Sequence, residues 1–333
     1  MSQPTASEKV DGVTPIPDRG KVAARRRRRA GSGTLVFVIA ALWITLSIAS
    51  PHFFTYNNLF NLGRQTAING LIAIGMTFVI ISAGIDLSVG SVVAITSLFV
   101  SLRLRAGNPI LLSVVLTLAL AVALGLINGI AVFEGNVPPF IATMGTMIVA
   151  RGIGMVISNA RIITGLPRPF ANFAQAAPFG IPTLVIVWLA SAALADFVLR
   201  RTTFGRAIYA LGSSPEASRL SGINLRRITY GVYAVSGFMS GIAGILLTSR
   251  LASGIPTSGQ GYELDAIAAA VVGGASLSGA EGSIVGTMLG ALIMSTLRNG
   301  GNLLGFDPFY LEIVIGVLLV MTVLLDQIRR RRG

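Results

Sequence analysis

The chain has 333 residues, of which 53% are hydrophobic and only 12% are charged, and its mean hydropathy is +0.76. These values exclude an ordinary soluble domain and indicate an integral membrane protein. The formal net charge is +13, but most basic residues adjoin apolar segments and few aromatic residues are interleaved with them, so we expect a lipid bilayer and no nucleic acid as partner.

Missing residue types narrow the chemistry further. The chain contains no cysteine and a single histidine, which excludes a structural zinc site and thiol chemistry. Both lysines, Lys9 and Lys21, lie near the N-terminus, and the chain has no Gly-Lys-Ser/Thr sequence of a nucleotide-binding P-loop. We therefore expect no metal, no cofactor and no P-loop ATP hydrolysis in this chain.

In chain order, residues 1–33 come first; they are polar, carry an arginine run at 25–29 and lack hydrophobic periodicity, which predicts a disordered basic tail. Residues 34–328 alternate long apolar stretches with polar or Gly/Pro-rich breaks, and residues 329–333 form a second basic tail. Only helices cross a bilayer with so many consecutive apolar residues, so we predict an all-α polytopic membrane protein. About ten membrane-spanning helices are expected, over residues 34–50, 66–83, 88–102, 110–133, 139–157, 181–199, 228–248, 263–277, 283–297 and 309–325.

The basic residues predict the orientation. With an even number of spans, both tails and the polar loop 200–227 lie on one side, and their excess of arginine makes that side cytoplasmic. A cleaved signal peptide is the alternative for the segment 34–50, although the tail before it is unusually long for a signal.

The segments 66–102 and 262–298 each have 37 residues and would each have to cross the membrane twice. Two full spans and a turn need more than about 40 residues, so both segments are too short for this. Their centres, "AGIDLSVGS" and "GGASLSGAEGS", both contain Gly-x-x-Leu-Ser followed by Gly-Ser. Hairpins broken by such Gly-rich turns line pathways in many transporters, although close helix packing also explains single glycines. The residues expected to line a substrate pathway are Asn69, Gly84, Asp86, Ser88, Gly90, Ser276 and Ser278.

An aspartate in the first centre is costly within an apolar run. We expect Asp86 to accept hydrogen bonds from freed backbone amides or from Ser88, and so to hold the shape of the break near the cytoplasmic part of the pathway. A direct contact with the transported solute and a proton relay are the alternatives.

The loop 200–227 contains a predicted short helix. Ser214 can cap it, Pro215 suits its first position and Gly222 can stop it. Because so short a helix is unstable alone, it needs a surface to dock on, either on a partner or along its own protein.

Four stretches carry a family resemblance: "GMTFVIISAGIDLSVGSVVA", "VPPFIATMGTM", "TTFGRAIYALGSSPEASRLSGI" and "GYELDAIAAAVVGGASLSGAEGSIVGTMLGALI". Together they resemble the permease subunits of bacterial ABC sugar importers of the ribose-permease type, in the monosaccharide and branched-chain amino acid permease superfamily. The resemblance covers nearly everything from about residue 35 onward. It implies a permease of the bacterial inner membrane that pairs with a second permease copy and receives sugar from a periplasmic or lipid-anchored binding protein. A cytoplasmic ATPase with two nucleotide-binding halves would drive it.

The resemblance also implies that the short helix is a coupling helix, which docks in a groove of the ATPase. One departure is visible, because the family has a Gly-Gly pair and a basic residue where this chain has Gly279, Ala280 and Glu281. The conformation of the second centre is therefore open. The residues expected to couple to the ATPase are Gly205, Arg206, Ser214, Pro215, Glu216, Arg219, Leu220 and Gly222.

The leading prediction is thus the permease subunit of an ATP-driven importer for a ribose-, xylose- or galactose-like monosaccharide. An ion-coupled secondary transporter is the alternative, and it would need a relay of membrane-embedded carboxylates. An intramembrane enzyme would need a nucleophile and a base, and His52 lies at a span end. The carboxylates available for a relay are Asp86, Glu134, Glu263, Asp265 and Glu312, most of them near span ends.

Overall fold

The computed structural model describes residues 19–331, which form helices joined by turns and loops, with no strand beyond one isolated bridge between Ile163 and Gly254. The all-α prediction is confirmed, and each of the ten predicted segments contains a helix. The helices are α1 (Arg19–Ala49), α2 (Tyr56–Ile81), α3 (Val89–Arg105), α4 (Ile110–Phe133), α5 (Pro139–Ser158), α6 (Arg168–Gln175), η1 (Pro178–Gly180), α7 (Thr183–Arg201), α8 (Thr203–Ser213), α9 (Pro215–Leu220), α10 (Leu225–Leu251), α11 (Tyr262–Val272), α12 (Ile284–Leu303) and α13 (Pro308–Arg331).

Several boundaries differ from the predicted ones. Helix α1 begins at Arg19 rather than at residue 34, so the part of the predicted tail from residue 19 onward is helical, and residues 1–18 lie outside the described residues. Helix α2 begins at Tyr56 rather than at residue 66, so its first turns contain polar residues that precede the apolar part, among them Asn57 and Arg64. Helices α6 and α8 were not predicted, since short amphipathic helices leave no long apolar signal.

Both predicted broken hairpins are present. The first consists of α2, a turn at residues 82–88 and α3, and the second of α11, a turn at 273–283 and α12. At about 1.5 Å per residue, the 17 residues of α3 and the 11 of α11 fall short of the roughly 30 Å of a bilayer core. Neither short helix crosses a membrane alone.

Helices α2 and α10 form the centre of the bundle. Every residue of α2 from Thr66 to Ile81 is buried, as expected for a helix that is apolar on all sides. Helix α10 packs against α2, α3 and α4, and glycines allow this approach, because a Cβ on Gly125 or Gly237 would clash with the backbone of the facing helix.

The outer helices expose apolar side chains. Within the described residues, five helices (α2, α4, α5, α7 and α10) are long and apolar enough to cross a membrane. Of these, α4, α5 and α7 turn large apolar groups outward, for example Leu111 (76% exposed), Val156 (75%) and Phe197 (58%). Such a surface fits lipid and not water, which agrees with a polytopic membrane protein.

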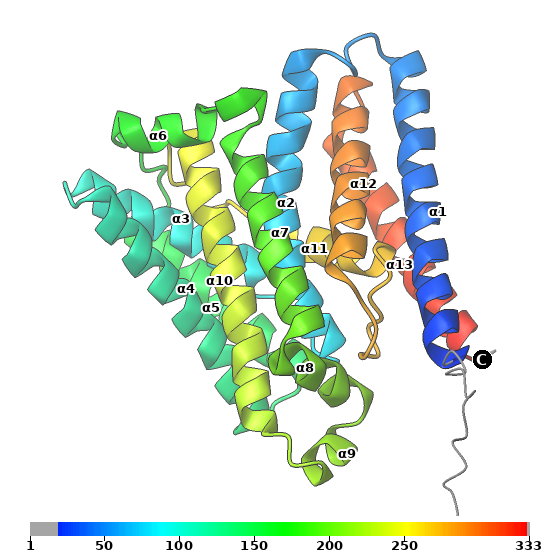
Figure 1. Ribbon diagram of the computed structural model, residues 1–333. Coiled ribbons are helices and arrows are strands. Elements are labelled where there is room, and N and C mark those ends of the chain that lie inside the picture. The colour runs from blue at the N-terminus through cyan, green and yellow to red at the C-terminus, as the bar shows by residue number, and fades with distance from the viewer. Residues whose placement is uncertain (1–18, 332–333) are drawn as a thin grey trace, which may run out of the picture.

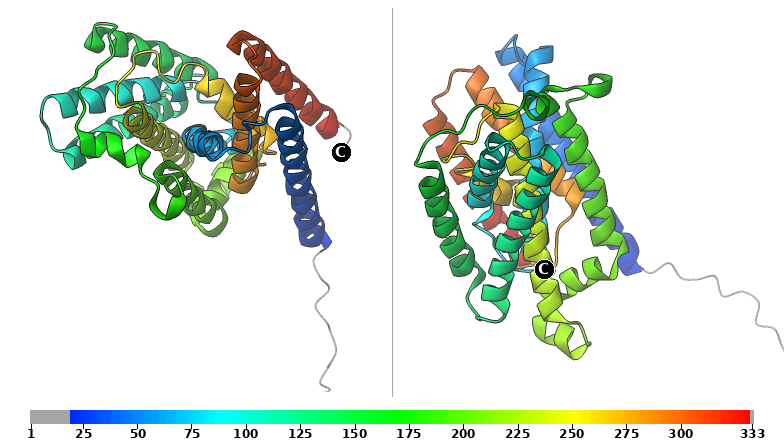
Figure 2. Two further views of the ribbon diagram at one scale, coloured as in Figure 1. Left: turned by 90° about the horizontal axis from the view of Figure 1, so that it is seen from above. Right: turned by 90° about the vertical axis from the view of Figure 1, so that its left-hand side faces the viewer.

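The bundle has two distinct ends. Helices α8 and α9 lie at one end and α6 at the other, and the start of α1 and the end of α13 lie toward the end of α8 and α9 (Figure 1). Seen from above, α1 and α13 stand at one flank and α4 and α5 at the opposite flank (Figure 2). This arrangement agrees with an even number of crossings.

The two ends should be distinguishable by chemical labelling, since the chain has no native cysteine. Phe179 in η1 is fully exposed at the α6 end, and Glu216 is exposed in α9. We expect Phe179→Cys to react with a membrane-impermeant maleimide in intact spheroplasts, and Glu216→Cys to react only in inverted vesicles. The cysteine-free parent is the control. Labelling of both variants from the outside would contradict this topology.

Candidate functional site

The break between α2 and α3 is built around Asp86, which is 1% exposed. One carboxylate oxygen accepts hydrogen bonds from the backbone N–H of Ser88 at 3.0 Å and from its hydroxyl at 2.6 Å. The other oxygen accepts from the hydroxyl of Ser236 in α10 at 2.7 Å. The bonds to Ser88 close an Asx-turn at the start of α3, as predicted, and the bond to Ser236 fixes this turn to the central helix.

Two further polar contacts tie the break to the outer helices. The Asn128 amide of α4 donates to the Ser88 hydroxyl at 2.8 Å, and the Leu87 backbone N–H donates to the Thr143 hydroxyl of α5 at 3.1 Å. Four helices other than α2 therefore meet at one turn. The sequence interpretation missed Asn128, Thr143 and Ser236, although a polar residue within an otherwise apolar span was the available signal.

Two polar atoms beside the break have no partner among the described residues. They are Oδ1 of Asn128 and the hydroxyl of Tyr233, and both are buried. A Cβ on Gly84 would lie 2.9 Å from the Tyr233 hydroxyl, so this hydroxyl faces the turn. Because buried polar groups are nearly always hydrogen-bonded, these atoms are suited to a bond with a buried water.

The glycines of the first centre act by permitting close contact. The left-handed residue that ends α2 is Ala83 (φ +62°), and Gly84 follows it. At Gly90, a Cβ would clash with the carbonyl of Gly259 and with a carboxylate oxygen of Glu263. The packing explanation that the sequence left open therefore holds for Gly84 and Gly90.

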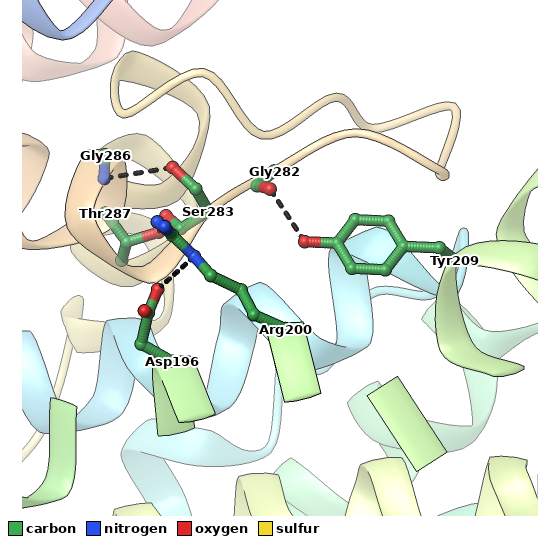
Figure 3. A network of polar contacts seen from close by, with 7 residues as sticks. All are labelled: Asp196, Arg200, Tyr209, Gly282, Ser283, Gly286 and Thr287. Atoms are coloured by element: carbon green, nitrogen blue, oxygen red, sulfur yellow. Dashed lines mark hydrogen bonds and ion pairs between the residues drawn. The ribbon is translucent and has the colours of Figure 1, made fainter. Parts of the chain in front are cut away.

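The second Gly-rich centre contains the same turn as the first, but a helix does not follow this turn directly. The Ser276 hydroxyl accepts from the Ser278 backbone N–H at 3.4 Å, the same i to i+2 pairing that joins Asp86 and Ser88. Helix α3 starts directly after Ser88, whereas α12 starts only after Ser283, whose hydroxyl accepts from the Gly286 N–H at 3.1 Å (Figure 3). The sequence match thus reflects a shared local turn.

The end of α8 lies against both broken hairpins. The Ala280 N–H of the second turn donates to the Ile81 carbonyl at the end of α2, at 2.9 Å. The Tyr209 hydroxyl of α8 donates to the Gly282 carbonyl at 2.9 Å (Figure 3). A Cβ on Gly212 would clash with the Ile81 carbonyl and the Ala280 nitrogen, so only glycine lets α8 approach so closely.

Comparison with known proteins agrees with this architecture. The family model described as "Branched-chain amino acid transport system / permease component" matches residues 58–323. The chain belongs to this family of permease components. The resemblance stated from the sequence is thereby confirmed.

Curated relatives of the permease cover almost its whole length. It is 44% identical to the ribose import permease protein of Escherichia coli strain K12, in an alignment 299 positions long that covers 87% of this chain and 92% of that protein. It is 45% identical to the ribose import permease protein of Bacillus subtilis strain 168 over 288 residues (86% and 89%). It is 34% identical to the xylose transport system permease protein of E. coli K12, in an alignment 369 positions long that covers 90% of this chain and 93% of that protein. No solved structure was found to match the permease.

The remaining predicted pathway residues of the permease are not all brought together. Ser276 is buried and Ser278 exposed, both in the turn that touches Ile81. Asn69 is buried in α2, and at about 1.5 Å per residue it lies roughly 18 Å along the helix from Ile81. Asn69 is therefore separate from the turns.

Ala280 resolves the departure noted in the sequence. It adopts a left-handed conformation (φ +62°) that glycine takes more readily, directly after Gly279 (φ +85°). The second turn therefore keeps a conformation that suits Gly-Gly although the second residue is alanine.

The predicted short helix of the permease is α9. The Ser214 hydroxyl accepts from the Ala217 N–H at 3.2 Å, and Gly222 is left-handed (φ +77°), so the predicted cap and stop are both present. The helix itself is shorter than the predicted 214–222 range. In the preceding α8, Gly205 is buried and Arg206 exposed. The exposed residues of the predicted coupling set after α8 are Pro215, Glu216, Arg219, Leu220 (79% exposed) and Gly222.

Proposed function

We propose that the permease is the membrane subunit of an ATP-driven, binding-protein-dependent importer of a ribose-, xylose- or galactose-like monosaccharide. Its relatives support the substrate class, since they are named for transport of ribose, D-allose and xylose. The observation that carries the mechanism is the contact of α8 with Ile81 and Ala280, one in each broken hairpin.

The proposed pathway passes the two turns, with Gly84, Asp86, Ser88 and Gly90 in one and Ser276 and Ser278 in the other; Asn69 lies farther along α2. The Asp86 carboxylate already accepts three hydrogen bonds, so its role is to hold the turn rather than to bind sugar. The unpartnered atoms of Asn128 and Tyr233 are better placed to meet sugar hydroxyls in transit.

The proposed coupling runs from α9 to the turns. Helix α9 would dock in a cytoplasmic ATPase with two nucleotide-binding halves. The start of α1 and the end of α13 lie toward the same end of the bundle as α9, which supports a position of both basic tails on the cytoplasmic side of the inner membrane. Displacement of α9 would move α8, and the contacts of Gly212 and Tyr209 would pass this movement to the turns. A periplasmic or lipid-anchored binding protein would deliver sugar at the α6 end, and a second permease copy would complete the pathway.

Transport in reconstituted vesicles tests this function. With the permease, its ATPase and its binding protein present, we expect sugar uptake to require ATP and to continue after the proton and sodium gradients are collapsed. Hydrolysis by the partner supplies the driving force, because the permease has no P-loop of its own. Uptake that needs no ATPase and stops when a gradient is collapsed would instead support the ion-coupled alternative.

A matched pair of glycine variants tests the docking role of α9. Gly222 and Gly107 are both left-handed (φ +77° and +81°) with open space around them, but Gly107 lies in the α3–α4 loop away from α9. Valine strains either position to the same extent. We expect Gly222→Val to reduce co-purification of the ATPase about tenfold, as a loss of about 1.4 kcal/mol would, and Gly107→Val to leave it unchanged. Equal behaviour of the two variants would refute the assignment.

A further inference from the structure

A cleft opens at the end of the permease opposite α9. Its volume is about 330 Å³, within the range of small-molecule sites. The first turns of α2 supply one wall, with side chains at i, i+1, i+4, i+5 and i+8 on a single helix face. The residues that line it include Tyr56, Asn57, Phe60, Asn61 and Arg64 from α2 and Gln175 from the end of α6.

Aromatic rings form the apolar part of this wall. The rings of Tyr56 and Phe60 lie with their centroids 4.1 Å apart at an angle of 34°, and Tyr56 is 66% exposed. The Arg64 guanidinium lies over the Phe60 ring at 5.9 Å. Phe60 therefore lies between Tyr56 and Arg64, and the outer face of the Tyr56 ring offers a platform for the C–H face of a sugar.

The polar part of the wall has unused hydrogen-bonding capacity. Arg64 donates to the Gln175 carbonyl at 3.0 Å, which fixes its position, while its Nε is buried without a partner among the described residues. Asn57 and Asn61 are exposed, and neither amide is hydrogen-bonded to the described part of the chain. The intervening Asn58 differs, because it pairs with Asn299 at 2.7 and 3.1 Å.

We propose that this cleft is a monosaccharide-binding site, at which the permease first contacts its sugar. The sugar ring would lie on the outer face of the Tyr56 ring, which Phe60 supports from behind, and its hydroxyls would bond to the amides of Asn57 and Asn61 and to Arg64. A neutral sugar fits better than an anion, because amides and aromatic rings line the cleft beside a single guanidinium, which already donates to the Gln175 carbonyl. The proposal rests on the proposed function and adds a binding site to it.

Binding to the isolated permease tests the site. The full-length chain in detergent, without ATPase or binding protein, is titrated with D-ribose and D-xylose and followed by ligand-observed NMR. We expect saturable binding that weakens at least fivefold in Asn57→Ala/Asn61→Ala, because each lost hydrogen bond to a hydroxyl weakens binding several-fold. Tyr56→Leu keeps an apolar side chain but removes the exposed aromatic face, and should also weaken binding. Asn302→Ala should bind as the parent does, because Asn302 is exposed in the last turn of α12, beside Asn299, and does not line the cleft.

The outcomes separate the two proposals. Absence of saturable sugar binding, unchanged binding in the double variant, or binding of glucuronate alone would overturn the cleft proposal. If ATP-dependent uptake by the complete system persists in such a case, the importer function stands without this site. If uptake by the complete system fails while the cleft binds ribose, the importer function fails and the binding site stands.

Discussion

The buried carboxylate of Asp86 is the constraint on which the rest of the permease depends. An ionised group removed from water is strongly destabilising unless its oxygens are hydrogen-bonded. Here both oxygens have partners, from the start of α3 and from α10. Movement of α3 relative to α10 would break the bond from Ser236 and leave one buried carboxyl oxygen without a partner, so these bonds define one arrangement of the break.

Further polar contacts join α2 to the second broken hairpin and hold the helices of that hairpin together. The hydroxyls of Thr77 in α2 and Thr287 in α12 lie 2.6 Å apart, and the bond from Ala280 to Ile81 joins the two turns. An ion pair of 2.8 Å between Asp265 and Arg298 holds α11 to α12. The two broken hairpins are thus connected along their length, and the end of α8 contacts them where they meet.

This connection gives a physical path between the two ends of the molecule. The cleft lies on the first turns of α2, and the Ile81 carbonyl lies at the last turn of the same buried helix. From there Gly212 and Tyr209 lead into α8, and Ser214 caps the exposed α9. A force applied at α9 therefore acts on the same helix that carries the proposed sugar contact.

Much of this architecture could be predicted from the sequence. Hairpins too short to cross twice, with Gly-rich centres, indicated the two breaks, and an aspartate in an apolar run indicated a hydrogen-bonded turn. Ser214, Pro215 and Gly222 carry local capping signals that do not depend on tertiary structure, so α9 was predicted as well.

The missed features depend on contacts between distant segments. Ser236 and Asn128 become partners of the break only when α10 and α4 pack beside it. Gly212 lies in a polar stretch whose pattern does not reveal its contact with Ile81. The left-handed residue of the first turn is Ala83, which no local sequence signal marks, and Gly84 lies close to the Tyr233 hydroxyl of α10.

A double-mutant cycle between Asp86→Asn and Ser236→Ala tests the central claim most directly. The free energy of unfolding in detergent is measured for the parent, both single variants and the double variant. Ser240→Ala replaces Ser236→Ala in the control cycle, since Ser240 is buried one turn farther along α10 and its hydroxyl has no partner among the described residues. The account predicts a coupling energy of at least about 0.5 kcal/mol between Asp86 and Ser236, and additive effects with Ser240. Additive effects in both cycles would contradict it.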